Sequence, residues 1–71
     1  MNNDTNKNWT VTYPEMFARI GTLANVLVMS HGAEAFESGG VARVRYSHEQ
    51  ALSAYYATRN LYFMELARAA Y

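Results

Sequence analysis

The first residues of the chain show no regular spacing of apolar positions. Residues 1–8 are polar and rich in asparagine, so we expect a disordered arm ahead of a single domain at 9–71. The segment from Trp9 to Tyr13 then alternates large apolar side chains with threonine, which is the spacing of a short half-buried strand. An extended lead-in that packs Trp9 and Val11 onto a helix fits the same pattern, and we prefer it.

Helical spacing follows and predicts a first helix at about 13–31. Thr12 and Glu15 have the spacing of a capping box, and Pro14 suits a first helical turn because its missing N–H would be unpaired there. Glu15 is also expected to pair with Arg19, one turn further along the same helix. The apolar stripe of this helix consists of Met16, Phe17, Ile20, Leu23, Ala24, Leu27 and Val28.

The middle of the chain, residues 33–46, has no single dominant period. Gly39 and Gly40 are adjacent and indicate a turn, since paired glycines break both helices and strands. Arg43 and Arg45 lie two positions apart, which places them on one face if this piece is extended. We expect a loop or a short strand here.

A second, longer helix is predicted at about 48–70. Ser47 and Gln50 have the spacing of another capping box, and no glycine or proline interrupts the segment that follows. Its apolar positions form two stripes. One consists of Leu52, Tyr55, Tyr56, Tyr62, Phe63, Leu66 and Ala70, and the other of Ala54, Ala57, Leu61 and Met64. A helix that is apolar on two sides needs two partners.

These elements predict a mainly α fold. The expected architecture is a hairpin of two helices with a short extended segment at its N-terminal end, assembled as a homodimeric helical bundle. The first helix would cover one side of the second, and another copy of the chain would cover the other side.

Length and composition support self-association. The chain has 71 residues, of which 51% are apolar or tyrosine, and it contains no cysteine. A domain of this size buries little surface by itself, and neither a disulfide nor a thiolate metal site is available to stabilise it. The formal charge is zero, and no apolar run is long enough to cross a bilayer. We therefore expect a cytoplasmic protein that does not enter a membrane.

Candidate catalytic groups are few. His31 and His48 are the two histidines, and neither lies in a spacing typical of metal ligands or of a general base. Both are interpreted as residues at helix ends. The serines lack the sequence context of an activated nucleophile. We therefore expect no enzyme activity, no metal and no cofactor.

Arg59 is the most informative single residue, because it lies in the middle of the aromatic stripe of the second helix. Tyr55 and Phe63 are four positions away, and Tyr56 and Tyr62 are three positions away. Arginine and tyrosine are enriched at the energetic centres of protein interfaces, so these five residues form the predicted partner-binding surface. Two structural interpretations stay open: a guanidinium that extends to the edge of the fold, or one paired to Glu34 or Glu37.

Arg43, Arg45 and the adjacent Tyr46 are the alternative site. Alternating arginines beside an aromatic ring suit a nucleic-acid backbone and its bases.

The sequence predicts a small regulator or inhibitor that masks an unidentified protein partner sterically. Chains of this format include proteins that bacteriophages encode against host machinery. The alternative function is a small dimeric nucleic-acid-binding regulator.

Overall fold

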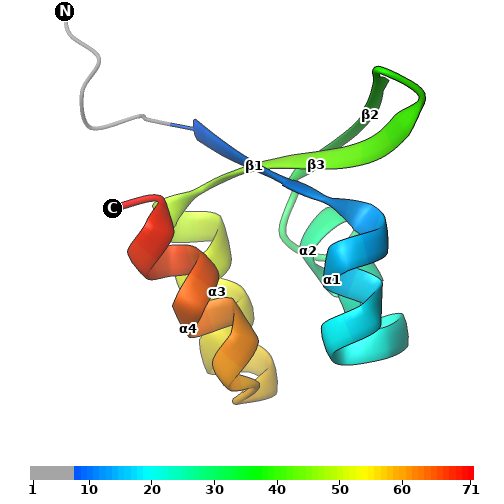
Figure 1. The fold of residues 1–71 in the computed structure, drawn as a ribbon. Helices are drawn as coiled ribbons and strands as arrows, with labels where there is room; N and C mark the ends of the chain where they lie inside the picture. The colour runs from blue at the N-terminus through cyan, green and yellow to red at the C-terminus, as the bar shows by residue number, and fades with distance from the viewer. Residues whose placement is uncertain (1–7) are drawn as a thin grey trace, which may run out of the picture.

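The chain folds as an antiparallel sheet with helices packed on one of its faces. A computed structural model describes residues 8–71. The disordered arm was predicted for residues 1–8, so all of it except Asn8 lies outside the described residues. Asn8 belongs to a strand. The elements in order are β1 (Asn8–Thr12), α1 (Tyr13–Ile20), the 3-10 turn η2 (Gly21–Leu23), α2 (Ala24–Met29), β2 (Glu34–Ser38), β3 (Val41–Ser47), α3 (His48–Thr58) and α4 (Leu61–Ala69). Figure 1 shows α1 and α2 under one half of the sheet, and α3 and α4 under the other.

The prediction of a mainly α, two-helix hairpin in a helical bundle is therefore wrong, and the fold is α+β. Strand order is β1-β3-β2, with both neighbours of β3 antiparallel to it. Our preference for a lead-in at the N-terminal end was also mistaken, since residues 8–12 form a strand that pairs with β3. Its partner lies more than thirty positions away, and a local sequence pattern does not report such pairing.

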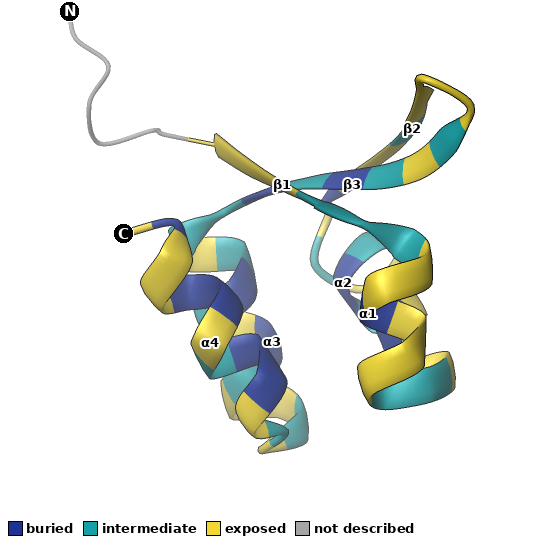
Figure 2. Ribbon diagram, in the orientation of Figure 1, coloured by how far each residue is buried: buried dark blue, intermediate teal, exposed yellow. Residues whose placement is uncertain are grey.

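The sheet has one covered and one open face. Val44 and Tyr46 of β3 are buried against the helices, and Val11 of β1 lies directly across from Val44. Arg43 and Arg45 alternate with them and therefore point to the opposite face. Beyond the helices the β2–β3 hairpin extends outward, and its tip at Gly39 and Gly40 is exposed (Figures 1 and 2). Both glycines have positive φ, at 62° and 77°, so the predicted turn is confirmed.

The first predicted helix is divided at Gly21. This residue ends α1 with φ 63°, a conformation that glycine adopts at little cost, and its N–H bonds to the carbonyl of Phe17. The chain then makes the 3-10 turn and continues as α2, which ends at Met29. The apolar stripe of this segment is thus divided among α1, η2 and α2.

The second predicted helix is divided at Arg59 and Asn60. Arg59 ends α3 in the left-handed conformation, and Asn60 begins α4 because its side chain accepts a hydrogen bond from the N–H of Tyr62 at 3.0 Å. The chain folds back at this point, so that α3 and α4 pack against each other. This fold-back buries Ala54 of the second apolar stripe, but Ala57 and Leu61 of that stripe are exposed.

The predicted starts of both helical segments are confirmed. Thr12 caps α1 by accepting from the Glu15 N–H at 3.3 Å. Ser47 and Gln50 form a complete capping box at the start of α3, with bonds of 2.9 Å and 3.2 Å.

The core lies between the sheet and the helices (Figure 2). Its largest fully buried side chains are Tyr46, Phe63, Met16, Leu27 and Val44. Small residues of the helices, among them Ala51, Ala54 and Ala67, are also fully buried, which lets α3 and α4 approach closely. The core also contains the Tyr46 hydroxyl, which donates to the Leu66 carbonyl at 3.0 Å.

Candidate functional site

The predicted partner-binding surface is divided by the fold. Arg59 and Tyr56 are exposed at the end of α3, with the Arg59 guanidinium carbon 5.8 Å from the centre of the Tyr56 ring. The ring of Tyr56 meets that of Tyr55 edge-on at 5.3 Å. Leu61, the first residue of α4, is 68% exposed beside them in sequence. We name Tyr56, Arg59 and Leu61 the Arg59 corner.

The other two predicted members of that surface lie inside. Phe63 is fully buried, and Tyr62 is only 6% exposed. The turn at Arg59 and Asn60 causes this separation, because side chains three or four positions apart share a face only within one continuous helix. Phe63 is therefore a core residue, whereas Tyr62 belongs to a different site.

Arg59 has a backbone conformation that arginine rarely adopts. Its φ is 59° and its ψ is 24°, and it is the one non-glycine residue with positive φ among residues 8–71. The left-handed region costs an L-residue with a Cβ roughly 1–2 kcal/mol, which is why glycine or asparagine usually ends a helix in this way. The guanidinium forms no ion pair within the described part of the chain, so neither Glu34 nor Glu37 meets it.

The alternative nucleic-acid residues are already engaged in contacts within the sheet. Arg45 pairs with Glu34 at 2.9 Å and stacks on the Phe36 ring at 4.4 Å. Arg43 donates through Nε to the Ser38 carbonyl at 3.5 Å. Tyr46 points to the opposite face and is buried, so it cannot stack on a base. The structure brings the two arginines to one face and separates the tyrosine from them.

A groove that the sequence did not indicate runs between β1, α1 and α4. Its volume is about 400 Å³, and we name it the β1 groove. Trp9 and Val11 of β1 and Leu66 of α4 contribute apolar walls, and Glu15, Arg19 and Glu65 contribute charges. All four residues from Trp9 to Thr12 line it, so the groove follows the outer edge of β1, which is unpaired within residues 8–71.

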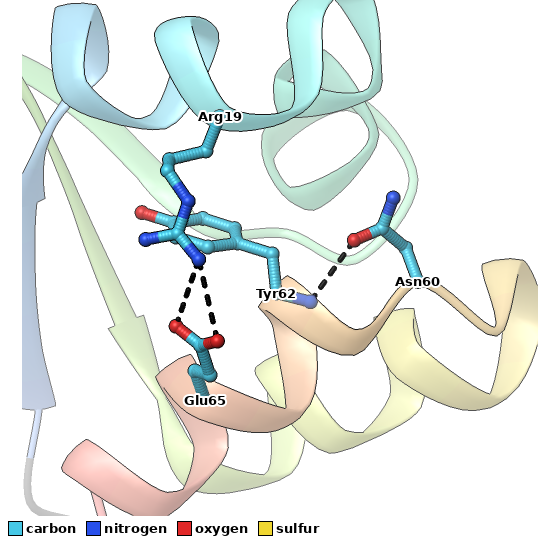
Figure 3. A network of polar contacts seen from close by, with 4 residues as sticks. All are labelled: Arg19, Asn60, Tyr62 and Glu65. Carbon is cyan, nitrogen blue, oxygen red and sulfur yellow. Dashed lines mark hydrogen bonds and ion pairs between the residues drawn. The ribbon is translucent and has the colours of Figure 1, made fainter.

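Arg19 connects the two sides of this groove. Its Nη2 donates to both carboxylate oxygens of Glu65, at 3.1 Å and 3.3 Å, and its guanidinium carbon lies 4.8 Å from the centre of the Tyr62 ring (Figure 3). The predicted pairing with Glu15 is therefore replaced by one across the fold. Nothing in the sequence links positions 19 and 65, because only the packing of α1 opposite α4 brings them together.

Two tyrosines, Tyr46 and Tyr62, line the groove. Burial, and after it the charge that Tyr62 would carry, raise the pKa of Tyr46 to about 12. Burial also raises the pKa of Tyr62, as do the carboxylates of Glu15 and Glu65, while Arg19 lowers it. Both hydroxyls are therefore protonated at neutral pH. The Tyr62 hydroxyl is buried and has no hydrogen-bond partner among residues 8–71.

No group of three His, Asp or Glu side chains between positions 8 and 71 is arranged to hold a metal ion. His48, at the start of α3, has its Nδ1 2.7 Å from the Ala67 carbonyl and its ring 4.8 Å from that of Tyr71. In the same part of the chain, no helix has the length and apolar character needed to cross a membrane.

Comparison with known proteins returned no relative: no protein-family model, no curated protein and no solved structure matches the chain.

Proposed function

We propose that this protein is a small regulator or inhibitor that binds a protein partner through the Arg59 corner and masks it sterically. One observation carries the proposal: an arginine occupies an exposed position whose backbone conformation favours glycine. Backbone strain that is not repaid by contacts within the fold is a reason to look for a role outside it. Arg59 lies near the exposed side chains of Tyr56 and Leu61. An arginine together with aromatic and apolar side chains is typical of interface centres.

The experiment uses Arg59→Gly, because this change removes the side chain and the strain together. We expect Arg59→Gly to unfold at an equal or higher denaturant concentration, with a gain of up to about 1 kcal/mol, and to lose the partner. Arg68→Ala is the matched control, since Arg68 is an exposed arginine near the other end of α4. The wild type, Arg59→Gly and Arg68→Ala are each used for affinity capture from a lysate of the source or host organism, with and without nuclease. Mass spectrometry identifies the proteins that each one retains.

A protein that the wild type and Arg68→Ala retain after nuclease, and that Arg59→Gly loses, supports the proposal. Equal retention by Arg59→Gly removes the Arg59 corner from the interface. Recovery that disappears with nuclease instead favours the nucleic-acid alternative through Arg43 and Arg45. The contacts of those arginines with Glu34, Phe36 and Ser38 argue against that alternative, because a phosphate would have to compete with them.

The homodimer stays a prediction. The fold-back of α4 onto α3 leaves Leu61 of the second apolar stripe 68% exposed. Phe17 of α1 is 45% exposed and Met29 of α2 is 82% exposed, and we expect a second copy to cover these two side chains as well. Light scattering after size exclusion should give twice the chain mass for the wild type. The double variant Phe17→Ser, Met29→Ser should have the mass of a monomer. A wild-type protein with the mass of one chain would refute the dimer.

A further inference from the structure

The β1 groove contains an unsatisfied hydrogen-bonding group. Tyr62 is more than nine-tenths buried and lines the groove, and its hydroxyl has no partner within residues 8–71. In Figure 3 this hydroxyl points away from the axis of α4. A buried hydroxyl without a partner is unfavourable for folding, so it is a reason to look for a ligand that completes it.

The charges around that hydroxyl favour a cation. Glu15 and Glu65 act on the Tyr62 oxygen as negative charges, and Arg19 is the one positive charge that opposes them there. Glu65 is paired with Arg19, whereas the Glu15 carboxylate forms no ion pair within the described residues. Arg43 also lines the groove, but it is not among the charges that act on the Tyr62 oxygen. Beside that oxygen an anion would meet the unpaired Glu15 carboxylate, and a cation would be stabilised by it.

Arg19 shows within the fold what this groove accommodates. Its guanidinium stacks on the Tyr62 ring and is bound by a carboxylate, which is the arrangement that recognises basic side chains. The side chains of Arg19 and Glu65 are 50% and 60% exposed, so their ion pair contributes little to stability and opens readily. Movement of Arg19 would uncover the Tyr62 ring, on which its guanidinium stacks.

The unpaired edge of β1 indicates how such a side chain would be presented. Four consecutive residues of β1 line the groove, and the outward N–H and C=O groups of this edge strand have no strand partner in the described chain. An extended segment can add to such an edge through main-chain hydrogen bonds and place alternate side chains in a neighbouring pocket.

We propose that the β1 groove binds a basic side chain, lysine or arginine, carried by an extended segment of a protein partner that adds to the edge of β1. The cationic group donates to the Tyr62 hydroxyl and to the Glu15 carboxylate, and the Trp9 and Val11 side chains cover its aliphatic stem. This site is separate from the Arg59 corner and does not depend on the function proposed for that corner.

The test uses three blocked five-residue peptides of alternating threonine and valine, with lysine, norleucine or glutamate in the centre. Amide chemical shifts of the ¹⁵N-labelled protein report binding. We expect the lysine peptide to shift amides of β1, α1 and α4, the norleucine peptide to bind at least about tenfold more weakly, and the glutamate peptide not to bind. Lysine amide alone should bind more weakly than the lysine peptide, because it lacks the main-chain bonds to β1.

Variants separate recognition from folding. Tyr62→Phe and Glu15→Gln should each weaken binding of the lysine peptide by about tenfold or more, and Glu49→Gln, an exposed change in α3, is the matched control. Tyr62→Phe should not lower Tm, because it removes an unpartnered group. Arg59→Gly should leave peptide binding unchanged.

The proposal is overturned if the lysine and norleucine peptides bind equally, or if none of the three binds. A Tyr62→Phe variant with a Tm several degrees below that of the wild type would show that the hydroxyl is bonded within the folded chain, and would overturn it as well. Equal affinity of lysine amide and the lysine peptide would remove the edge of β1 from the site.

Discussion

Removal of the Tyr46 hydroxyl should destabilise the protein at neutral pH and stabilise it at high pH. The hydroxyl donates to the Leu66 carbonyl at 3.0 Å from a side chain that is 1% exposed. Tyr46→Phe loses this bond, but the Leu66 carbonyl keeps its bond from the Ala70 N–H at 3.1 Å. We therefore expect a cost of about 1 kcal/mol at pH 7, the usual net value of one hydrogen bond.

The sign reverses because of the raised pKa. The pKa of Tyr46 is about 12 in the folded protein and about 10 in the unfolded chain, so the unfolded chain loses its proton first as pH rises. The contribution of the protonated hydroxyl is complete below pH 10 and is lost between about pH 10 and pH 12. Linkage gives a loss of about 1 kcal/mol at pH 11 and about 2 kcal/mol at pH 12 for the wild type. Tyr46→Phe does not suffer this loss, so the two stability curves should cross near pH 11.

Urea unfolding followed by far-UV circular dichroism, at half-unit steps from pH 8 to pH 12, gives both curves. Tyr56→Phe removes an exposed hydroxyl and is the matched control for the loss of one tyrosine. Curves for wild type and Tyr46→Phe that stay parallel over the whole range would refute the reasoning, because they would show that the hydroxyl ionises alike in the folded and unfolded protein.

Two further predictions concern the stripe and the cap that the sequence indicated. Phe63→Ala should lower the free energy of unfolding by about 3–5 kcal/mol, because the Phe63 ring is fully buried. Tyr56→Ala should lower it by less than about 1 kcal/mol, because the Tyr56 ring is exposed. Similar losses for the two variants in urea titrations would mean that the two rings are buried alike. Ser47→Ala should cost about 0.5–2 kcal/mol, since the first turn of α3 loses the bond to the Gln50 N–H; an unchanged urea midpoint would show that this cap is not used in solution.

Local signals in the sequence predicted local structure well. The caps at Thr12 and Ser47 and the glycine turn at 39–40 were read correctly, because each depends on residues within a few positions of one another. Asn60 carries a further local signal, because asparagine is a preferred N-cap and therefore indicates a new helix start within the predicted second helix. Arg59 gave no such warning, since arginine ordinarily favours a continuing helix.

The sheet and the groove could not be predicted in this way. The strand at 8–12 has an alternating pattern, but its pairing with β3 is a contact between distant segments. The β1 groove depends on that pairing and on the approach of Arg19 to Glu65, which the spacing of neither residue reports. The predicted bundle failed for a related reason, because the turn at Arg59 and Asn60 divides each apolar stripe of the predicted long helix between α3 and α4.

The pairing of β1 with β3 also implies an order in which the chain acquires its structure. The β2–β3 hairpin and the α3–α4 pair each close over a short turn, whereas β1 must find a strand more than thirty residues away. Closing the longer loop has the larger entropic cost, so β1 is expected to dock last during folding and to detach first during partial opening. Hydrogen exchange should therefore be faster at the β1 amides that bond to β3 than at those of the β2–β3 hairpin. The β1 groove would then exist only while β1 is paired with β3. A ligand bound in the groove would therefore also hold the N-terminal strand onto the sheet.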